Sequence, residues 1–410
     1  MAIKLLIGGS PCTYWSIAQK NGRETQAEGM GWELFKNYLI AKEKFKPDYF
    51  LYENNKSAAQ AIKDQIAEEF GVGVDPNVRF TYINSALVSA QNRQRFYVTN
   101  FGDIAQPEDR GILLKDILET GQPQNETLLR PYGNNEKSRP ITAHYPNNFG
   151  GWYNRINDPR PEKQQIDIIV EQVGSLPKPN GDLSSSQSGR IYSIDGKSTT
   201  QNAGGGGLGG KTGLYAVPIE EKVGYATPCE WDENGIPTKA KSCADGKVYT
   251  VYEVVDGQIT IKGKQYPIKL KNGYYIIRKL TVTECARLQT MPDNYCKAVS
   301  DSQAYKGLSN GWTAEVIIWL LNHALKDVPR DEEIVVLSMY DGIGTGRYCL
   351  DKMGFTNITY HAYEIDKYPI MVAMDNYPDI VQHGDAFAVR EDDWKAPQTK
   401  AEWLDDLLAC

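Results

Sequence analysis

The sequence predicts an α/β protein built on a mixed, mostly parallel sheet, with a second and irregular domain inserted in the middle of the chain. The first hundred residues and the last eighty alternate short apolar strands with helical stretches, whereas residues 103–272 are rich in Pro, Gly, Asn and Ser. Alternation of strands and helices is typical of parallel sheets covered by helices. We expect residues 1–102, 276–330 and 331–410 to form one domain and residues 103–275 to form the other.

The first hundred residues supply four of the expected strands and two helices. Each apolar stretch is short and bounded by turn-forming residues, as strands are. The strands are KLLIG (4–8), DYFLYEN (48–54), RFTYIN (79–84) and RFYVTN (95–100), and the helices span 31–45 and 57–70.

The remaining elements follow in chain order. Short strands are expected at YAVPI (215–219) and VYTVYEVV (248–255), helices at 281–290 and 313–325, and strands at 334–340, at 358–364 and ending at 383–385. The glycine-rich run 202–213 is either a flexible linker or a loop that meets a ligand or a DNA backbone.

Composition narrows the class of protein. The 410 residues are 41% hydrophobic and 24% charged, which excludes a wholly disordered chain. Apolar runs such as 316–321 are far shorter than the ~20 residues that cross a bilayer. The opening lacks a secretory signal, so we expect a cytoplasmic protein with no membrane partner. Seven scattered cysteines without a CxxC pair indicate reduced thiols and no metal site.

The net charge of −7 is unevenly distributed along the chain. Residues 331–410 hold 6 basic and 16 acidic side chains, net −10, whereas residues 130–275 hold 18 and 15, net +3. Because binding to phosphates depends on local patches, the overall acidity does not exclude a nucleic-acid partner.

A strand, a glycine turn and a helix follow one another near the end of the chain. The strand 334–340 leads directly into Asp341-Gly342-Ile343-Gly344-Thr345-Gly346. Glycines let backbone amides approach a nucleotide, and Glu364 at the end of the next strand suits ribose hydroxyls. With Asp385 after a third strand, three carboxylates favour a cationic, adenosine-bearing ligand over a pyrophosphate. An ordinary tight turn is the alternative.

A thiol, a carboxyl and two guanidinium groups suggest a catalytic site near the start of the chain. Cys12 follows a strand on a loop that Pro11 stiffens, although a lone cysteine is often only a small buried side chain. Glu53 ends a very apolar strand, where desolvation would keep its carboxyl protonated and able to donate a proton; a strand-end cap is the alternative. Arg93 and Arg95 alternate onto one face and would seek anions or carbonyls, or form a solvated strand start.

These signals together resemble the cytosine-C5 DNA methyltransferase family. Gly9-Ser10-Pro11-Cys12 is similar to its Pro-Cys nucleophile motif, Glu53-Asn54 to its Glu-Asn motif, and Gln91-Asn92-Arg93-Gln94-Arg95 to its Gln-x-Arg-x-Arg motif. Further matches are 278–284 with Arg287 and Gln289, Ser309-Asn310-Gly311-Trp312 on a helical element, and the three acidic motifs at 341, 364 and 385.

The resemblance implies a Rossmann-like fold that binds S-adenosyl-L-methionine, with 103–275 as the target-recognition domain. It implies catalytic roles for Cys12, Glu53, Arg93 and Arg95, and substrate contacts from Ser10, Pro11, Asn54 and Gln91. The expected cofactor contacts are Asn310, Trp312, Tyr340, Asp341, Gly342, Gly344, Glu364, Ile365 and Asp385. Tyr340 stands where the family commonly has Phe, but an aromatic ring there can still stack on adenine.

The order of motifs departs from that of the family, because the cofactor motifs come last. This resembles a circular permutation, which a chain tolerates when it is cut at an exposed loop and its former ends lie close together. The permutation predicts that KLLIG (4–8) is an interior strand beside the strands of residues 334–390.

The resemblance implies a partner and a mechanism. In double-stranded DNA a cytosine would be flipped out of the stack, the Cys12 thiolate would add to C6, and Glu53 would protonate or hydrogen-bond N3. Arg95 and Arg93 would bind the O2 side of the base and a phosphate, and Asn54 would help hold the Glu53 loop. Candidate DNA contacts in the middle segment are Arg139, Arg155, Arg160, Arg190 and Lys211.

Three other functions remain open from the sequence. A tRNA cytosine methyltransferase would share the site motifs, a catalytically idle DNA-binding or regulatory subunit would need none of the catalytic set, and a small-molecule methyltransferase would need no long insertion. The recognised DNA sequence, a role in restriction-modification or in self-protection of a phage genome, and the oligomeric state are not encoded in these motifs.

Overall fold

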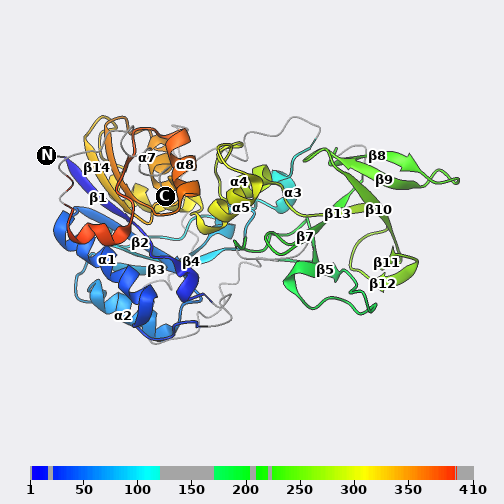
Figure 1. The fold of residues 1–410 in the computed structure, drawn as a ribbon, viewed down its shortest axis with the longest axis horizontal. Helices are drawn as coiled ribbons and strands as arrows, with labels where there is room; N and C mark the ends of the chain where they lie inside the picture. Colours follow the sequence, from blue (N-terminus) through cyan, green and yellow to red (C-terminus); the bar gives the residue numbers. More distant parts are fainter. Residues whose placement is uncertain are drawn as a thin grey trace, which may run out of the picture.

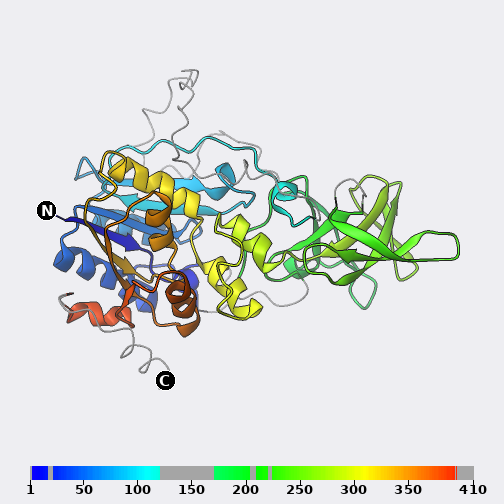
Figure 2. The ribbon, with the colours of Figure 1, turned by 90° about the horizontal axis from the view of Figure 1, so that it is seen from above.

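The protein folds into two lobes that lie side by side along its long axis (Figure 1). The computed structural model describes residues 2–16, 22–120, 170–203, 209–219, 224–392 and 394. One lobe carries both the start and the end of the described chain around a central sheet flanked by helices, and the other is made of strands from the middle of the chain (Figure 2).

The first lobe is built on a seven-stranded sheet. Its order is β16-β15-β14-β1-β2-β4-β3, and every neighbouring pair is parallel except those that involve β4. The strands are β1 (Ile3–Gly8), β2 (Tyr49–Asn55), β3 (Arg79–Asn84), β4 (Gln94–Thr99), β14 (Ile334–Met339), β15 (Ile358–Tyr363) and β16 (Val381–Gln382).

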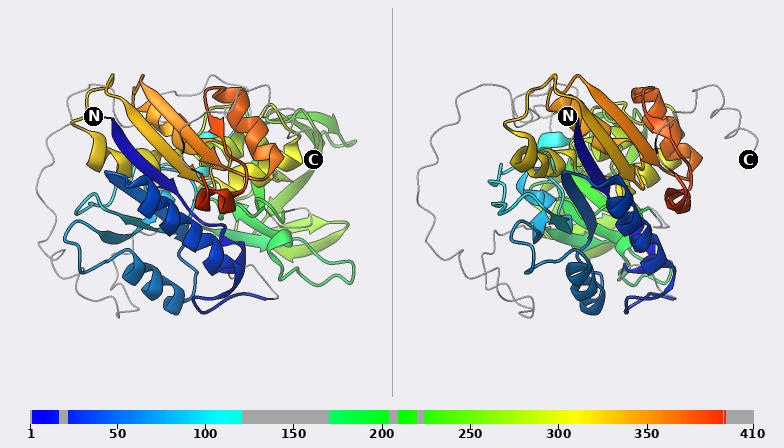
Figure 3. Two further views of the ribbon diagram at one scale, coloured as in Figure 1. Left: turned by 60° about the vertical axis from the view of Figure 1, so that its left-hand side comes forward. Right: turned by 90° about the vertical axis from the view of Figure 1, so that its left-hand side faces the viewer.

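Strand β1 lies in the interior of this sheet, between β14 and β2, as the sequence predicts. Its residues pair in parallel with β14 from Ile3 opposite Ile334 to Gly8 opposite Met339. Figure 3 shows this first strand, in dark blue, beside the orange strands of the C-terminal segment. The two ends of the chain therefore contribute to one sheet.

The side chains of β1 explain why the strand is buried. Leu5 and Ile7 belong to one hydrophobic cluster, with helices α6 (Ala314–Leu325) and α7 (Thr345–Lys352), and Leu6 belongs to the cluster on the opposite face, with α1 (Gly29–Phe45). All three side chains are fully buried. Because neighbouring residues of a strand point to opposite faces, an uninterrupted apolar run is what a strand covered on both sides requires.

Helices cover both faces of the sheet. Helices α1 (Gly29–Phe45) and α2 (Gln60–Glu69) contribute to the Leu6 cluster. The remaining helices contribute to the cluster that contains Leu5 and Ile7. They are α3 (Leu114–Ile117), α4 (Val282–Leu288), α5 (Asp301–Asn310), α6 (Ala314–Leu325), α7 (Thr345–Lys352) and α8 (Lys367–Asn376). In the described part of the chain, no helix has the length and apolarity to span a membrane.

The second lobe is more regular than the sequence predicts. Nine strands form a sheet with the path β12-β11-β10-β13-β7-β6-β5, to which the β8–β9 hairpin is added through β10. They are β5 (Gln172–Ser175), β6 (Arg190–Ser193), β7 (Leu214–Pro218), β8 (Ala226–Trp231), β9 (Pro237–Ser242), β10 (Val248–Val255), β11 (Gln258–Ile261), β12 (Lys264–Pro267) and β13 (Gly273–Arg278). Most neighbours in this sheet are successive strands, and the sequence predicted only β7 and β10 because the other strands are four to six residues long.

Lys197 joins the two lobes. Its buried ammonium group donates hydrogen bonds to the carbonyls of Ala86, Ser89 and Ile112 at 2.8, 3.2 and 2.5 Å. A buried charge is tolerated only where hydrogen bonds compensate its lost hydration, so these three acceptors fix the second lobe to the loops beside β4.

Candidate active site

The candidate site lies where β1 and β14 end side by side. From β14 the chain proceeds to β15 and β16 on one side of the sheet, and from β1 it proceeds to β2 on the other. The strand order therefore reverses between these two strands. Parallel sheets bind ligands beyond the carboxyl ends of the strands at such a reversal.

The loop after β1 carries Cys12 and needs glycine at two positions. A Cβ on Gly8 would lie 2.3 Å from the carbonyl oxygen of Met339, and one on Gly9 would lie 2.3 Å from that of Glu53. Pro11 then precedes a short 3₁₀ turn that begins at Cys12, whose side chain is partly exposed. The neighbouring strands therefore fix the path of the loop while its thiol stays accessible.

Asn54 holds this loop in place from below. Its side-chain amide donates to the carbonyl of Ser10 at 2.9 Å and to the Tyr52 hydroxyl at 3.1 Å, and that hydroxyl lies 2.8 Å from Ser10 Oγ. Asn54 is 1% exposed and Ser10 is 3% exposed. Both were expected to contact substrate, but their polar groups are turned toward each other, two residues before Cys12.

Glu53 is largely buried, as the sequence predicts, and its carboxyl group has two polar partners. Oε1 pairs with Arg95 Nε at 2.9 Å, and Oε2 accepts a hydrogen bond from the indole of Trp312 at 3.1 Å. The side chains of Glu53 and Arg95 are 12% and 10% exposed. The apolar strand before Glu53 predicted burial correctly but could not reveal partners that come from β4 and from residue 312.

Arg93 is also placed differently from the expectation that it faces substrate or solvent. It is 3% exposed, and its guanidinium donates to the carbonyls of Ser309 and Gly311 at 3.0 and 2.8 Å. Burial, followed by the nearby charge of Arg95, lowers the pKa of Arg93. Arg93 therefore fixes the backbone of residues 309–311, whereas Arg95 contacts the Glu53 carboxylate.

Residues 309–312 connect the thiol side of the site to the glycine turn. They leave the end of α5, so only Ser309 and Asn310 are helical, whereas the whole motif was expected on a helix. A Cβ on Gly307 would lie 2.8 Å from Ile343 Cγ2, and one on Gly311 would lie 3.5 Å from Ile343 Cδ1. The segment is thus in close contact with the glycine turn and, through Trp312, with Glu53.

The glycine turn after β14 has the backbone geometry that the sequence predicts. Tyr340, Gly342 and Gly344 all have positive φ, and among the described residues, apart from its chain neighbours, no atom lies within 4 Å of a Cβ added to Gly342. Glu364, at the end of β15, accepts hydrogen bonds from the amides of Gly342, Ile365 and Asp366 at 2.9, 2.9 and 2.8 Å. Its carboxylate therefore shapes the turn, and burial raises its pKa.

Asp341 points beneath the turn. Its Oδ1 accepts hydrogen bonds from Ser338 Oγ and the Tyr360 hydroxyl, both at 2.7 Å, while Oδ2 is buried with no partner among the described residues. Burial raises the pKa of Asp341 to about 6 against the opposing effect of these two hydrogen bonds. Asp341 therefore ionises less readily than an ordinary aspartate.

The remaining expected cofactor residues lie around the turn. Ile365 is 71% exposed, Asp385 is exposed after β16, and Asn310 is exposed at the end of α5. The Tyr340 hydroxyl donates to the carbonyl of Leu34 at 2.7 Å, which holds the ring against α1. The open space at Gly342, the exposed apolar side chain of Ile365 and the surrounding carboxylates fit a cationic adenosine derivative.

The block of residues 278–289 has a structural rather than a ligand-binding geometry. Arg278 and Glu284 form a bidentate pair with distances of 2.7 and 2.6 Å, and the two side chains are 1% and 0% exposed. Gln289 donates to the carbonyl of Leu308 at 2.7 Å, which joins α4 to the end of α5. This block supports the segment that carries Trp312.

Gln91 is buried, with no route to substrate in this structure. It is 0% exposed, and neither its amide oxygen nor its amide nitrogen has a hydrogen-bond partner among the described residues. It forms an isolated parallel bridge with Ser198 of the second lobe. Its expected contact with substrate is not supported by this placement.

The expected DNA contacts of the middle segment are only partly placed. Arg139, Arg155 and Arg160 lie outside the described residues. The side chain of Arg190 bonds locally to Gln187 and Ser185, and Lys211 Nζ lies 3.2 Å from Ser302 Oγ and over the ring of Tyr305.

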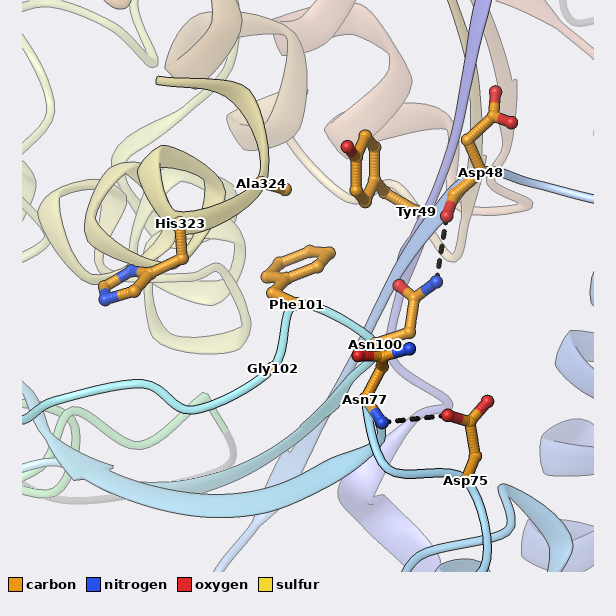
Figure 4. A pocket seen from close by; sticks show the side chains of 9 residues that line it. All are labelled: Asp48, Tyr49, Asp75, Asn77, Asn100, Phe101, Gly102, His323 and Ala324. Atoms are coloured by element: carbon orange, nitrogen blue, oxygen red, sulfur yellow. Dashed lines mark hydrogen bonds between the residues drawn. The ribbon is translucent and has the colours of Figure 1, made fainter. Parts of the chain in front are cut away.

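A cavity of about 400 Å³ lies away from this site (Figure 4). It is lined by residues that precede β2 and follow β4, among them Asp48 and Asn100, and by His323 of α6. Because β4 runs antiparallel to β2, these positions lie at the amino ends of the parallel strands, opposite to Cys12. Among the described residues, no group of three or more His, Cys, Asp or Glu side chains is arranged to hold a metal ion.

The tyrosine and tryptophan partners of the catalytic groups were not found from the sequence. In the sequence, Tyr52 precedes Glu53 in an apolar strand, which predicts a core side chain, and Trp312 was expected to contact the cofactor. The available signal lay in the family resemblance, because Trp312 and Thr313 extend a motif that usually ends in Val or Ile. The indole at this position brings an N–H donor that those aliphatic side chains lack.

Comparisons with known proteins agree with the geometry. Residues 1–325 match the model of the family described as C-5 cytosine-specific DNA methylase. The chain is 25% identical over 366 residues to the orphan methyltransferase M.SPRI of Bacillus phage SPR, covering 76% of this chain and 80% of that protein. It is 24% identical over 347 residues to the type II methyltransferase M.Bpa9945I of Bacillus paralicheniformis, covering 80% and 71%.

Among solved structures, the Entamoeba histolytica methyltransferase EhMeth is similar with a TM-score of 0.38 and 10% sequence identity, over 79% of this chain and 78% of that chain.

Proposed function

Because the chain belongs to the C-5 cytosine-specific DNA methylase family, and thus to the DNA cytosine-5 methyltransferases that use S-adenosylmethionine, we propose that it acts on double-stranded DNA through a covalent bond from Cys12 to C6 of the base. The observation that supports this proposal most strongly is that the loop carrying Cys12 and the glycine turn lie next to each other. Cys12 follows β1, the glycine turn follows β14, and these strands are parallel neighbours that end at the same edge.

Covalent catalysis answers a specific chemical difficulty. C5 of cytosine is a weak nucleophile while the ring is aromatic, and addition of a thiolate at C6 makes it the nucleophilic carbon of an enamine. Cys12 forms the S–C6 bond, and the electron pair displaced toward N3 is neutralised by a proton held between N3 and the Glu53 carboxyl group. Arg95 orients that carboxyl group through Oε1.

The cofactor-side residues are Ile365 for an adenine face, Glu364 and Asp385 for hydroxyl and amine donors, and the amides of the glycine turn. S-adenosylmethionine, when bound there, supplies a methyl group on a positively charged sulfur. After C5 is methylated, loss of the C5 proton to a base and expulsion of the Cys12 thiolate from C6 restore the aromatic ring.

The target base must leave the duplex to reach Cys12, because neither face of C6 is exposed within stacked DNA. Unstacking costs a few kcal/mol, so we propose that contacts from the second lobe to the DNA offset this cost. We place the site of action in the cytoplasm of a bacterium or of a cell infected by a phage.

We also propose that the chain is a circular permutation of the usual order of motifs. The interior position of β1 beside β14 supports it, because an uninterrupted sheet is formed although its cofactor half is encoded last. Joining residue 390 to residue 3 and opening the chain before β14 would yield a protein of the same fold. We expect that permuted variant to retain methyl transfer.

Replacement of Cys12 tests the covalent step. Cys12→Ser removes the thiolate, so we expect methyl transfer to fall at least about 1,000-fold, while titration calorimetry shows S-adenosylmethionine binding unchanged. Wild-type protein incubated with cofactor and DNA containing 5-fluorocytosine should form an adduct that survives denaturing electrophoresis, since fluorine cannot leave as a proton does. Full transfer by the serine variant would exclude this mechanism.

A further inference from the structure

Trp312 is the side chain that contacts the catalytic carboxyl group from the cofactor side of the site. Its indole Nε1 donates to Glu53 Oε2 at 3.1 Å, across 259 residues of sequence. The other oxygen of the carboxylate is held by Arg95 Nε at 2.9 Å. Each oxygen therefore has one donor of fixed direction and retains a lone pair for a further hydrogen bond.

The oxygen bound by Trp312 is the one that lies over the nucleophile loop. A Cβ on Gly9 would lie 3.2 Å from Glu53 Oε2, three residues before Cys12. If the indole donor were absent, the carboxylate would be restrained only at Oε1 and could rotate about its terminal torsion, which is broad for glutamate. The indole thus selects the orientation in which one oxygen faces the Cys12 loop.

The backbone around Trp312 is anchored on both sides, which is what a positioning side chain needs. Before it, the carbonyl of Gly311 accepts a hydrogen bond from Arg93 at 2.8 Å. After it, Thr313 Oγ1 lies 2.8 Å from Gln289 Oε1, and the amide of Ala314 donates to the Gln289 carbonyl at 2.9 Å. Because Arg93, Thr313 and Gln289 are buried, the backbone from which the indole extends is held in place.

We propose that Trp312 is a positioning residue for Glu53, and that it orients the carboxyl group for proton transfer at N3 of the target cytosine. This rests on the proposed function, in which Glu53 handles that proton. It gives Trp312 a role beyond a contact with the cofactor. The effect acts on the addition of Cys12 to C6 and not on S-adenosylmethionine binding.

The test compares the chemical step with cofactor binding. Trp312→Phe keeps an aromatic ring and removes the N–H. With DNA labelled with tritium at C5 of cytosine and saturating S-adenosylmethionine, we expect tritium release to slow roughly 10- to 100-fold, as loss of a hydrogen bond to a charged group would cause. The dissociation constant for S-adenosylmethionine, measured by titration calorimetry, should change by less than about threefold.

Two further variants make the outcome specific. Benzothienylalanine at position 312 has the shape of the indole without its N–H, and it should reproduce the slow release even if the phenylalanine variant folds poorly. Trp319→Phe is the matched control, because its indole N–H donates to the carbonyl of Ala105 and not to Glu53. It should release tritium at the wild-type rate.

A double-mutant cycle separates this inference from the proposed function. In a Glu53→Gln background, Trp312→Phe should cause little additional loss, because the carboxylate it orients is gone. Full additivity, or a large rise in the S-adenosylmethionine dissociation constant with normal chemistry, would overturn the positioning role. If Glu53→Gln itself releases tritium at the wild-type rate, it is the proposed role of Glu53 that fails.

Discussion

Asn54 offers the most direct test of how the nucleophile loop is held. Its amide group donates to the carbonyl of Ser10 at 2.9 Å and to the Tyr52 hydroxyl at 3.1 Å, and all three residues are buried. Asn54→Ala removes both donors. The Tyr52 hydroxyl keeps Ser10 Oγ as a partner at 2.8 Å, whereas the Ser10 carbonyl loses this donor.

The expected magnitude follows from that buried carbonyl. A buried acceptor left unsatisfied costs about 1–3 kcal/mol of folding stability, and the loop can avoid part of this cost by moving toward solvent. Cys12 is two residues away, so the same movement displaces the thiol. A misplacement of about 1 Å can slow a reaction by about 100-fold, and we therefore expect a loss of roughly 10- to 100-fold in methyl transfer.

Asn100→Ala is the matched control for this substitution. The Asn100 amide donates to the carbonyl of Asp48 at 2.8 Å and its oxygen accepts from the amide of Phe50 at 2.8 Å, at the amino end of β2 (Figure 4). Like Asn54, it connects neighbouring segments of the sheet through side-chain hydrogen bonds, but it lies at the amino ends of the parallel strands, opposite to Cys12. It should lose stability without losing the rate of the chemical step.

The assay measures single-turnover methyl transfer and thermal unfolding for both variants. We expect the rate to fall for Asn54→Ala alone, and we expect slower trapping of that variant by DNA containing 5-fluorocytosine. If Asn54→Ala transfers methyl groups as fast as the wild type at a temperature where both are folded, Asn54 does not position Cys12.

Two further predictions concern stability. Glu284→Ala leaves the charged Arg278 without its partner at 1% exposure, so urea unfolding should show that the free energy of unfolding falls by about 3–5 kcal/mol. The control is Asp293→Ala, which removes a carboxylate that is 46% exposed beside Arg287 and should lower the free energy of unfolding by about 1 kcal/mol or less. Equal losses in the two variants would contradict this account. Burial raises the pKa of Asp341 from 3.8 to about 6, so the folded protein binds this proton more tightly and stability falls, by about 2 to 3 kcal/mol, as pH rises between these values. Asp341→Asn cannot titrate, so its stability relative to the wild type should grow from pH 4 to pH 6 and stay constant above; a difference independent of pH would refute the assignment.

The interior strands and the two functional loops were predictable because their signals are local. The run Leu5-Leu6-Ile7 is apolar without alternation, which only a strand buried on both faces requires, and the glycines that follow β1 and β14 mark positions where a side chain would clash or φ is positive. The sheet of the second lobe was only partly predicted: β7 and β10 were expected, whereas the other strands are four to six residues long, and the pairing of β13 with β7 joins segments far apart in sequence.

The orientation of side chains within the site was less predictable. Arg93 and Arg95 lie close enough for the charge of Arg95 to lower the pKa of Arg93, but one guanidinium bonds to backbone carbonyls of residues 309–311 and the other to Glu53. Which partner each guanidinium group bonds depends on where α5 ends in space relative to β4. The spacing of residues within the motif does not predict that position.

The sequence by itself determined the kinds of chemical group available: a thiol on a constrained loop, a carboxyl at the end of one strand, guanidinium groups at the start of another, and a glycine turn bordered by acids. These depend on residue type and short spacing. Only the tertiary structure decided which side chains meet, because the contacts of Trp312 with Glu53 and of Arg93 with residues 309–311 join residues more than 200 positions apart. Such contacts arise from the packing of the whole sheet and its helices, and a local pattern carries no record of them.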